Sequence, residues 1–228
     1  MAKVLRVDYI ENQRAQDRLC SEGETLKRLT HLHIVRAYEV IENPCPVVIL
    51  EMLPGETLDY LIRTHRRRRL SLSNIVLLGL HLCSATHYLH RQGLLHLNLK
   101  PSNIVAALGV AKVIDLSIAR RPGKARRRGI GTRQYMAPEQ ARGGLLSEAT
   151  DVWGIGAVLF HATTGQRPFE AETGSKYQQL ERRAEPVRSY RRVPAAFGTA
   201  VDRCLDPEPA RRPTVDELAD LLYQLVTS

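Results

Sequence analysis

Four polar residues with distinct chemical capacities lie close together near the middle of the sequence. Asn98, Lys100 and Asn103 belong to the run His-Leu-Asn-Leu-Lys-Pro-Ser-Asn at 96–103, and Asp115 follows Asn103 by twelve residues. A lysine presents a compact positive charge to an anion, and the oxygens of asparagine and aspartate are the ligands that hard divalent cations take. The amide of Asn98 can accept a hydrogen bond but cannot take up a proton near neutral pH.

The elements that must position these residues change character along the chain. Before Pro54-Gly55 the pattern favours strands at 3–8, 34–41 and 47–52, with one helix at 21–29. After this break the pattern favours helices at 57–64, 72–91, 152–164, 180–183, 195–205 and 215–226, with short extended pieces at 103–106 and 111–114.

Five further motifs follow the 96–103 run in a fixed order. They are Asp115-Leu116-Ser117, a Gly-Thr-x-x-Tyr-Met-Ala-Pro-Glu run at 131–139, Asp-Val-Trp-Gly-Ile-Gly at 151–156, Gly-x-x-Pro-Phe at 165–169, and Arg212-Pro213. In this order and spacing, the six motifs resemble the protein kinase family, whose catalytic loop reads H-R-D-L-K-P-x-N and whose later motifs are D-F-G and A-P-E. The resemblance covers most of the chain and is closest to bacterial serine/threonine kinases.

The resemblance implies an α+β, protein-kinase-like two-lobe fold. We expect a partial N-lobe at residues 1–53, with a reduced antiparallel sheet plus one helix, and a mostly helical C-lobe at 54–228. The two lobes would form a single kinase-like domain.

The resemblance also implies a binding site for ATP and magnesium. Lys3 and Glu22, nineteen residues apart, match the ion pair that meets the α- and β-phosphates. The alternatives are that Lys3 is an ordinary lysine near the chain start, and that Glu24 replaces Glu22, although Glu24 has the wrong spacing to Leu26 and Leu29.

The other expected contacts of ATP and magnesium come from four positions. Backbone groups of Glu51 and Leu53 would hold adenine, and Asn103 and Asp115 would bind magnesium. Lys100 would approach the γ-phosphate, and a lysine at this position, together with a threonine at 132, resembles the serine/threonine branch. Glu139 and Arg212 are expected to form a structural ion pair.

Three departures from the family pattern bear on activity. Asn98 stands where the family has the aspartate that accepts the hydroxyl proton, and general-base assistance is typically worth about 10²–10⁴-fold. No G-x-G-x-x-G loop occurs, and the sequence begins almost at Lys3. Either Met1 is not the true start, or another element covers the first strand, or the protein lacks this loop. Leu97 replaces the arginine that receives an activation-loop phosphate, so we do not expect control by such phosphorylation.

Composition and charge limit the remaining classes of protein. The net charge is +9 and is concentrated in two runs, 63–69 and 120–128, while 43% of the residues are hydrophobic, enough for a sizeable core. The apolar stretch at 152–164 is too short to cross a bilayer, and the first residues lack the apolar segment of a signal peptide. We therefore expect a cytoplasmic protein without a membrane span.

Three functional hypotheses stay open. The first is a pseudokinase that acts through a regulatory protein partner, with weak or absent binding of ATP and Mg²⁺. The second is a slow but active serine/threonine kinase with a protein substrate. The third uses the basic runs to bind an acidic protein or nucleic acid, of which we do not expect nucleic acid.

Overall fold

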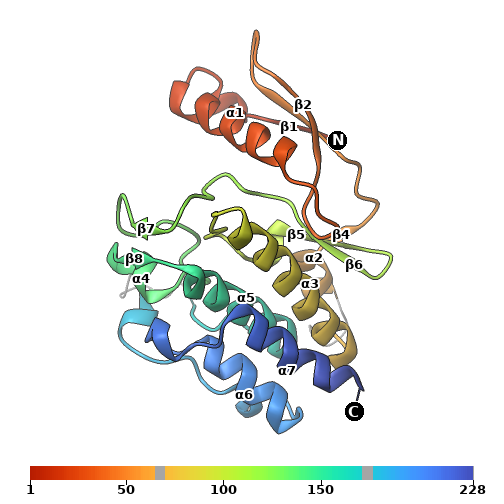
Figure 1. Cartoon of the computed structure of the whole chain (residues 1–228), viewed down its shortest axis with the longest axis vertical. Helices are drawn as coiled ribbons and strands as arrows, with labels where there is room; N and C mark the ends of the chain where they lie inside the picture. Colours follow the sequence, from red (N-terminus) through yellow and green to blue (C-terminus); the bar gives the residue numbers. More distant parts are fainter. Residues whose placement is uncertain (65–69, 171–176, 228) are drawn as a thin grey trace.

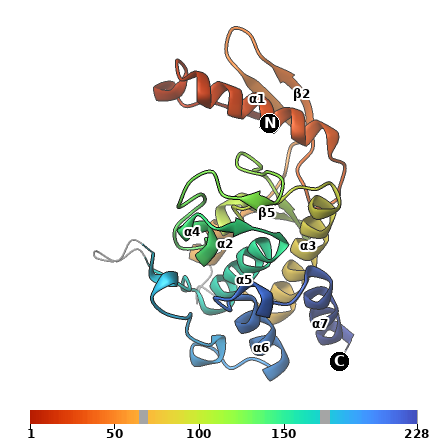
Figure 2. The same ribbon diagram turned by 60° about the vertical axis from the view of Figure 1, so that its left-hand side comes forward.

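The computed structural model describes residues 1–64, 70–170 and 177–227. Figures 1 and 2 show two tiers, with α1, β1 and β2 in the upper tier and α3, α5, α6 and α7 in the lower tier. In chain order the strands and helices are β1 (Ala2–Val4), α1 (Gln13–Arg28), β2 (Ala37–Ile41), β3 (Val47–Leu50), β4 (Glu56–Thr57), α2 (Leu58–Thr64), α3 (Leu72–Arg91), β5 (Ile104–Ala107), β6 (Val110–Val113), β7 (Gly123–Lys124), α4 (Pro138–Arg142), β8 (Leu145–Leu146), α5 (Glu148–Thr164), α6 (Ala195–Cys204) and α7 (Val215–Thr227).

The upper tier is a three-stranded antiparallel sheet covered by α1. The strand order is β1-β3-β2, and Lys3 on β1 stands opposite Val48 on β3. Helix α1 approaches the sheet at Gly23, where an added Cβ would lie 2.6 Å from Val40 Cγ2 and 2.7 Å from Val48 Cγ2. The missing side chain at Gly23 therefore lets the helix lie close enough to the sheet to bring its neighbour, Glu22, toward β1.

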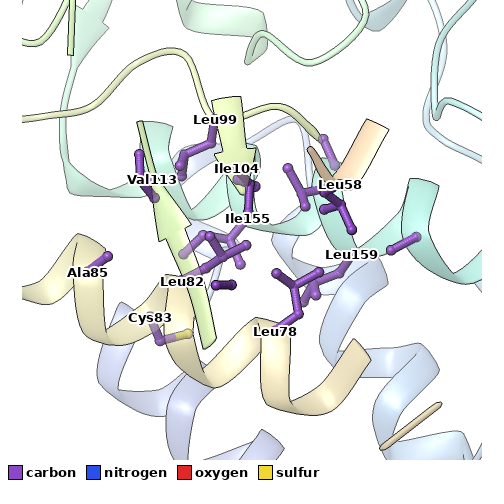
Figure 3. Packing of buried hydrophobic residues seen from close by; sticks show 14 of the residues in the cluster. Leu58, Leu78, Leu82, Cys83, Ala85, Leu99, Ile104, Val113, Ile155 and Leu159 are labelled. Atoms are coloured by element: carbon purple, nitrogen blue, oxygen red, sulfur yellow. The ribbon is translucent and has the colours of Figure 1, made fainter. Parts of the chain in front are cut away.

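The lower tier is built around α5. Every residue of this helix from Thr150 to Thr164 is buried, so it is surrounded by other elements rather than lying on a surface. Figure 3 shows Ile155 and Leu159 of α5 meeting Leu78 and Leu82 of α3 beneath the β5–β6 hairpin. The catalytic-loop residues that precede β5 therefore lie on a packed layer of buried side chains from α3 and α5.

Two features join the tiers. The small antiparallel sheet β4-β5-β6 lies on top of the lower tier, and its β6 also bridges to Ile34 in the segment after α1. His33 Nδ1 lies 2.9 Å from the carbonyl oxygen of Ala111 on β6. These contacts fix the segment that leads from α1 to β2 onto the lower tier.

The observed architecture confirms the expected α+β kinase-like fold, with three local corrections. The expected strand at 3–8 stops at Val4 and is followed by a 3₁₀ turn at Val7–Tyr9. The expected helix at 180–183 is a 3₁₀ turn at Gln178–Leu180. Helix α1 begins eight residues before the expected residue 21, because Asn12 caps it by accepting a hydrogen bond from the Ala15 amide at 3.1 Å.

Helix α3 is long and apolar enough to cross a membrane when judged by length and composition alone. Half of its most apolar window is buried inside the protein, and Leu82 lies fully within the core. A buried core helix passes the same test, so this finding is weak support for a membrane span.

Candidate functional site

The ion pair expected from the sequence is present between β1 and α1. Lys3 Nζ lies 2.7 Å from both carboxylate oxygens of Glu22 and 3.4 Å from Asp115 Oδ1. The Leu116 amide donates to Glu22 Oε1 at 3.0 Å. One lysine therefore gathers residues from the first strand, the first helix and the segment after β6.

The two carboxylates that share Lys3 have opposite pKa shifts. Burial, which outweighs the attraction of Lys3, raises the pKa of the Glu22 carboxyl. Burial also opposes ionisation of Asp115, but Lys3 and the hydrogen bonds from Ser117 outweigh it and hold the pKa of Asp115 at about 2. Asp115 is therefore ionised throughout the physiological range.

The catalytic-loop backbone is held by Asp151, in the first turn of α5. Its carboxylate accepts hydrogen bonds from the His96 amide at 2.8 Å and the Leu97 amide at 2.7 Å, and His90 Nε2 lies 2.9 Å away. Leu97 adopts a φ of 64°, an uncommon conformation for a residue with a branched side chain. The buried carboxylate fixes a backbone geometry that a leucine does not prefer.

Asn98 is bound on both its backbone and its side chain. Its Oδ1 accepts a hydrogen bond from the Thr132 hydroxyl at 3.0 Å, and its carbonyl oxygen accepts one from Asn103 Nδ2, also at 3.0 Å. Its backbone amide donates to His96 Nδ1 at 3.1 Å. The amide of Asn98 is thereby held in the position that the family pattern assigns to an aspartate.

Asn103 and Asp115 are brought together by a backbone contact. The Ile114 amide donates to the Asn103 carbonyl at 3.0 Å, next to Asp115 in the chain. Because Asn103 Nδ2 already donates to Asn98, the side-chain oxygen of Asn103 is the atom able to bind a cation. Lys100 is half-buried and directly precedes the 3₁₀ turn at Pro101–Asn103.

Glu51 and Leu53 lie in the connection between the tiers. The Glu51 carboxylate accepts hydrogen bonds from Lys112 Nζ at 2.7 Å and from the Arg36 amide at 2.9 Å. Its side chain therefore supports the connection, and any contact of Glu51 with a ligand would come from the backbone. Leu53 is half-buried beside it.

Two side chains that sequence reasoning did not assign to the site hold its outer edge. Gln140 Nε2 donates to the Leu97 carbonyl at 2.8 Å and to the Ile130 carbonyl at 2.9 Å, and Asp151 binds the other side of the loop. A buried carboxylate in the first turn of a mostly apolar helix was the available signal for Asp151, whereas nothing local marks Gln140. Arg212 binds both oxygens of Glu139 at 2.7 and 2.9 Å, which confirms the expected structural pair.

The protein kinase domain family matches residues 1–223 of the chain. The chain belongs to this family. It is 29% identical over 197 residues to serine/threonine-protein kinase PknB of Mycobacterium tuberculosis, covering 81% of this chain and 31% of that protein. It is 26% identical over 219 residues to a probable serine/threonine-protein kinase of Clostridium acetobutylicum, covering 92% of this chain and 33% of that protein. The matched region is 29% identical over 182 residues to human myosin light chain kinase 3, covering 77% of this chain and 22% of that protein.

These comparisons confirm a serine/threonine kinase family of bacterial type. The chain spans about a third of the length of its bacterial relatives. Protein kinases generally use ATP and Mg²⁺, and the residues present fit both by their chemistry. An ionised Asp115 and an amide oxygen of Asn103 are ligands of the kind that Mg²⁺ takes, and Lys3 and Lys100 offer positive charge to phosphates.

Proposed function

We propose that this kinase domain transfers phosphate from ATP weakly or not at all and acts through protein partners. The observation that carries the proposal is Asn98, whose side-chain oxygen already accepts the Thr132 hydroxyl at 3.0 Å. An amide cannot take the proton of an attacking hydroxyl. With kinase turnover of about 1–100 per second and a loss of about 10²–10⁴-fold, on the order of 10⁻⁴ to 1 per second would remain.

A slow serine/threonine kinase is the second candidate, and the assembled ion pair favours it. Lys3 contacts both Glu22 and Asp115, and its ammonium group offers a positive charge to a phosphate. Bound MgATP would supply the phosphoryl group, with its charge spread over oxygen atoms. Lys3 and Lys100 would hold the phosphates, Asn103 and Asp115 the cation, and backbone groups of Glu51 and Leu53 the adenine.

The proposal places the domain in the cytoplasm, with a regulatory protein partner or, for the second candidate, a protein substrate. We do not propose nucleic acid as a partner. The slow kinase and the partner-binding domain differ in one measurable quantity, the rate of transfer to a protein.

Restoring the carboxylate at residue 98 tests the proposal. We expect Asn98→Asp to raise phosphate transfer to a generic basic protein by about 10²–10⁴-fold, because the new carboxylate can accept both the Thr132 hydroxyl and the substrate proton. The measurement is incorporation of radiolabelled γ-phosphate, with Asn98→Asp/Asp115→Ala as the matched control that should return to background. The same assay on the unmodified chain separates the two candidates.

Two results would count against the proposal. Transfer by the unmodified chain at the upper end of the expected range, about 1 per second, that disappears in Asp115→Ala would establish the slow kinase instead. An Asn98→Asp variant that melts cooperatively and shows no rise would mean that residue 98 does not limit the reaction.

A further inference from the structure

Three histidines lie together where the upper tier joins the lower tier. His33, in the connecting segment between α1 and β2 (residues 29–36), lies face to face with His81 of α3, with ring centroids 4.1 Å apart and planes 21° apart. His31 lies 5.6 Å from His33 and stacks on Tyr88 of α3 at 4.9 Å. Because His81 and Tyr88 are seven residues apart, they share one face of α3, and the connecting segment packs against that face.

This histidine cluster, His31, His33 and His81, lies beside the backbone bonds that hold the connecting segment on β6. The Val35 amide donates to the Val113 carbonyl at 2.8 Å, and the Val113 amide donates to the His33 carbonyl at 2.9 Å. His33 Nδ1 lies 2.9 Å from the carbonyl oxygen of Ala111, whose amide donates to His81 Nδ1 at 3.3 Å. A single residue of β6 is therefore bonded to one histidine of each tier.

These hydrogen bonds determine which nitrogen of each ring carries its proton. His81 Nδ1 accepts a backbone N–H, so its proton is on Nε2. His31 Nδ1 accepts from the His33 amide at 3.2 Å, so its Nε2 carries the proton and donates to the Ser84 hydroxyl at 3.3 Å. His33 Nδ1 faces a carbonyl oxygen and donates to it. Each ring thus makes its bonds as the neutral imidazole.

A further proton on any of the three rings would disrupt this arrangement. On His81 or His31 it would go to Nδ1, which faces a backbone N–H, so two donors would replace a hydrogen bond. On His33 it would go to Nε2 and place a positive charge on a ring whose centroid is 4.1 Å from that of His81. Burial is the main cause that lowers the pKa of all three rings, and the pKa of His81 falls to about 4.

The charged groups around the cluster do not favour an added proton. Lys112 of β6 contributes positive charge toward His31 and His33, and it pairs with Glu51 at 2.7 Å. The cavity beside His31 is lined by three further charged or titratable groups: His87, Arg91 and Asp216. The carboxylate among them lies 2.7 Å from the His87 ring.

Two further observations limit what the cluster can bind. The cavity that His81 lines has no charged side chain among its other lining residues. Within residues 1–64, 70–170 and 177–227, no group of three or more His, Cys, Asp or Glu side chains is placed to hold a metal ion. The cluster is therefore best understood through its own protonation.

We propose that the histidine cluster is a pH-sensitive switch that holds the two tiers together at neutral pH and releases the connecting segment in acid. In the open form the three rings are exposed to water and bind protons more readily, so acid favours separation of the segment from β6 before the whole chain unfolds. Because the pKa of each ring in the closed form lies below the ordinary 6.5, the closed form is favoured above pH 6.5 and weakens as the pH falls toward 4.

Release of the connecting segment would loosen the position of α1. This helix leads directly into the segment and carries Glu22, which binds Lys3 of the upper tier, whereas Asp115 follows β6 in the lower tier. The switch requires neither ATP nor phosphate transfer and does not rest on the proposed function. Its failure would leave the transfer assay unaffected.

Amide hydrogen exchange followed by NMR at pH 7.5 and pH 5.0 tests the switch on the full chain. Rates are expressed as protection factors, which correct for slower intrinsic exchange in acid. The Val35 and Val113 amides report on the connecting segment, and the Leu159 amide, in the core of α5, reports on global unfolding. We expect protection of Val35 and Val113 to fall by about thirtyfold or more between the two pH values. Leu159 should stay more strongly protected than either amide at both.

A matched pair of variants assigns the effect to the cluster. His81→Asn removes the titratable ring and keeps an oxygen that can accept from the Ala111 amide. His87→Asn makes the same substitution on the same helix, at a side chain that is 50% exposed and outside the cluster. The loss of protection at Val35 should shrink by about tenfold or more in His81→Asn and change by less than about twofold in His87→Asn.

A constant loss of stability in either variant cancels, because each variant is compared with itself at two pH values. Titration of the ring protons by NMR in the unmodified chain gives a second measurement that needs no variant. We expect His31, His33 and His81 all to titrate below pH 6.5 in the folded chain.

Four outcomes would overturn the inference. Equal protection of Val35 and Val113 at both pH values would show that acid does not open the segment. Protection factors at Val35 equal to those at Leu159 would show global unfolding alone. Equal behaviour of His81→Asn and His87→Asn would remove His81 from the effect. Ordinary titration of the three rings near pH 6.5 in the folded chain would remove its physical basis.

Discussion

Single side chains decide what the site between the two tiers can do. Asn98 differs from the aspartate of the family pattern by one amide group, yet this removes the ability to accept a proton while keeping the hydrogen bond to Thr132. Lys3, by contrast, keeps its contacts with both Glu22 and Asp115. The groups expected to bind ATP and Mg²⁺ thus surround a position, residue 98, that has an amide where the family pattern has a carboxylate.

A buried histidine sets a pH dependence of stability that is separate from the site. His161 Nδ1 lies 2.7 Å from the Tyr135 hydroxyl, and burial lowers the pKa of His161 to about 4 from an ordinary 6.5. The unfolded chain therefore binds more protons than the folded chain between these two values, and stability is lost as the pH falls through 6.5 toward 4. From pH 7.5 to 5, His161 alone should lower the free energy of unfolding by about 2 kcal/mol.

Urea unfolding at both pH values checks this prediction. His161→Gln should show a smaller loss of stability at pH 5 than the unmodified chain, by about 2 kcal/mol. His87→Gln is the control, because the His87 side chain is 50% exposed and lies outside the core. An equal loss in the unmodified chain and in His161→Gln would contradict the assignment.

Helix α1 is the element on which the site depends most, because it carries Glu22. Its register against the sheet is set at Gly23, where only a glycine leaves room for the methyl groups of Val40 and Val48. Helix α5 plays the equivalent part in the lower tier, since Asp151 in its first turn holds the catalytic-loop backbone. Each helix thus positions one carboxylate: Glu22 of α1 binds Lys3 on β1, and Asp151 of α5 binds the backbone amides of residues 96 and 97.

Gly23→Ala should destabilise the protein even though alanine favours helices by about 1 kcal/mol over glycine. The added Cβ would meet Val40 and Val48 at 2.6 and 2.7 Å, and overpacking of this kind typically costs about 1–3 kcal/mol. We expect a net loss of up to about 2 kcal/mol in urea unfolding. Arg14→Ala, on the exposed face of the same helix, should change stability by less than about 0.5 kcal/mol. A more stable Gly23→Ala variant would show that α1 has room to move away from the sheet.

The whole molecule brings the groups proposed to bind ATP and Mg²⁺ together from both tiers, so binding of this ligand should be linked to folding. Lys3 and Glu22 come from the upper tier, and Asn103 and Asp115 from the lower. A ligand that contacts both sets stabilises the folded chain by mass action, by about 2.7 kcal/mol at a hundred times its dissociation constant.

A thermal melt with and without MgATP measures this linkage. If ATP and Mg²⁺ bind, saturating MgATP should raise Tm by about 5–10 °C for a chain of this size. The rise should disappear in Asp115→Ala and persist in Asp220→Ala, an exposed aspartate on α7. A rise would favour a slow kinase or a domain regulated by nucleotide. Cooperative melting without a rise would favour a domain that acts through partners alone.

The sequence by itself determined the family, the order of the motifs and most helices, and it predicted which residues would surround the phosphates and the cation. These features depend on local spacing: the 72–91 helix has the same bounds in the structure as in the sequence pattern. The start of α1 was missed, because residues 13–20 are mostly polar and only the cap at Asn12 marks it. The sequence pattern predicts a helix at 180–183, whereas the structure has a 3₁₀ turn at Gln178–Leu180.

Only the tertiary structure decided how side chains distant in sequence meet. Asp151 reaches the amides of residues 96 and 97 across more than fifty residues, and it holds Leu97 at a φ that its own sequence does not favour. The sequence does not show which way the side chains of the basic run at 120–128 point. In the structure, Arg126 and Arg127 line a cleft together with residues of α1, and the side chain of Arg128 lies near Gly143, the residue at which α4 ends. Residues 65–69 of the other basic run lie outside the described part of the chain. Local patterns specify elements, but which side chains face one another depends on the packing of those elements.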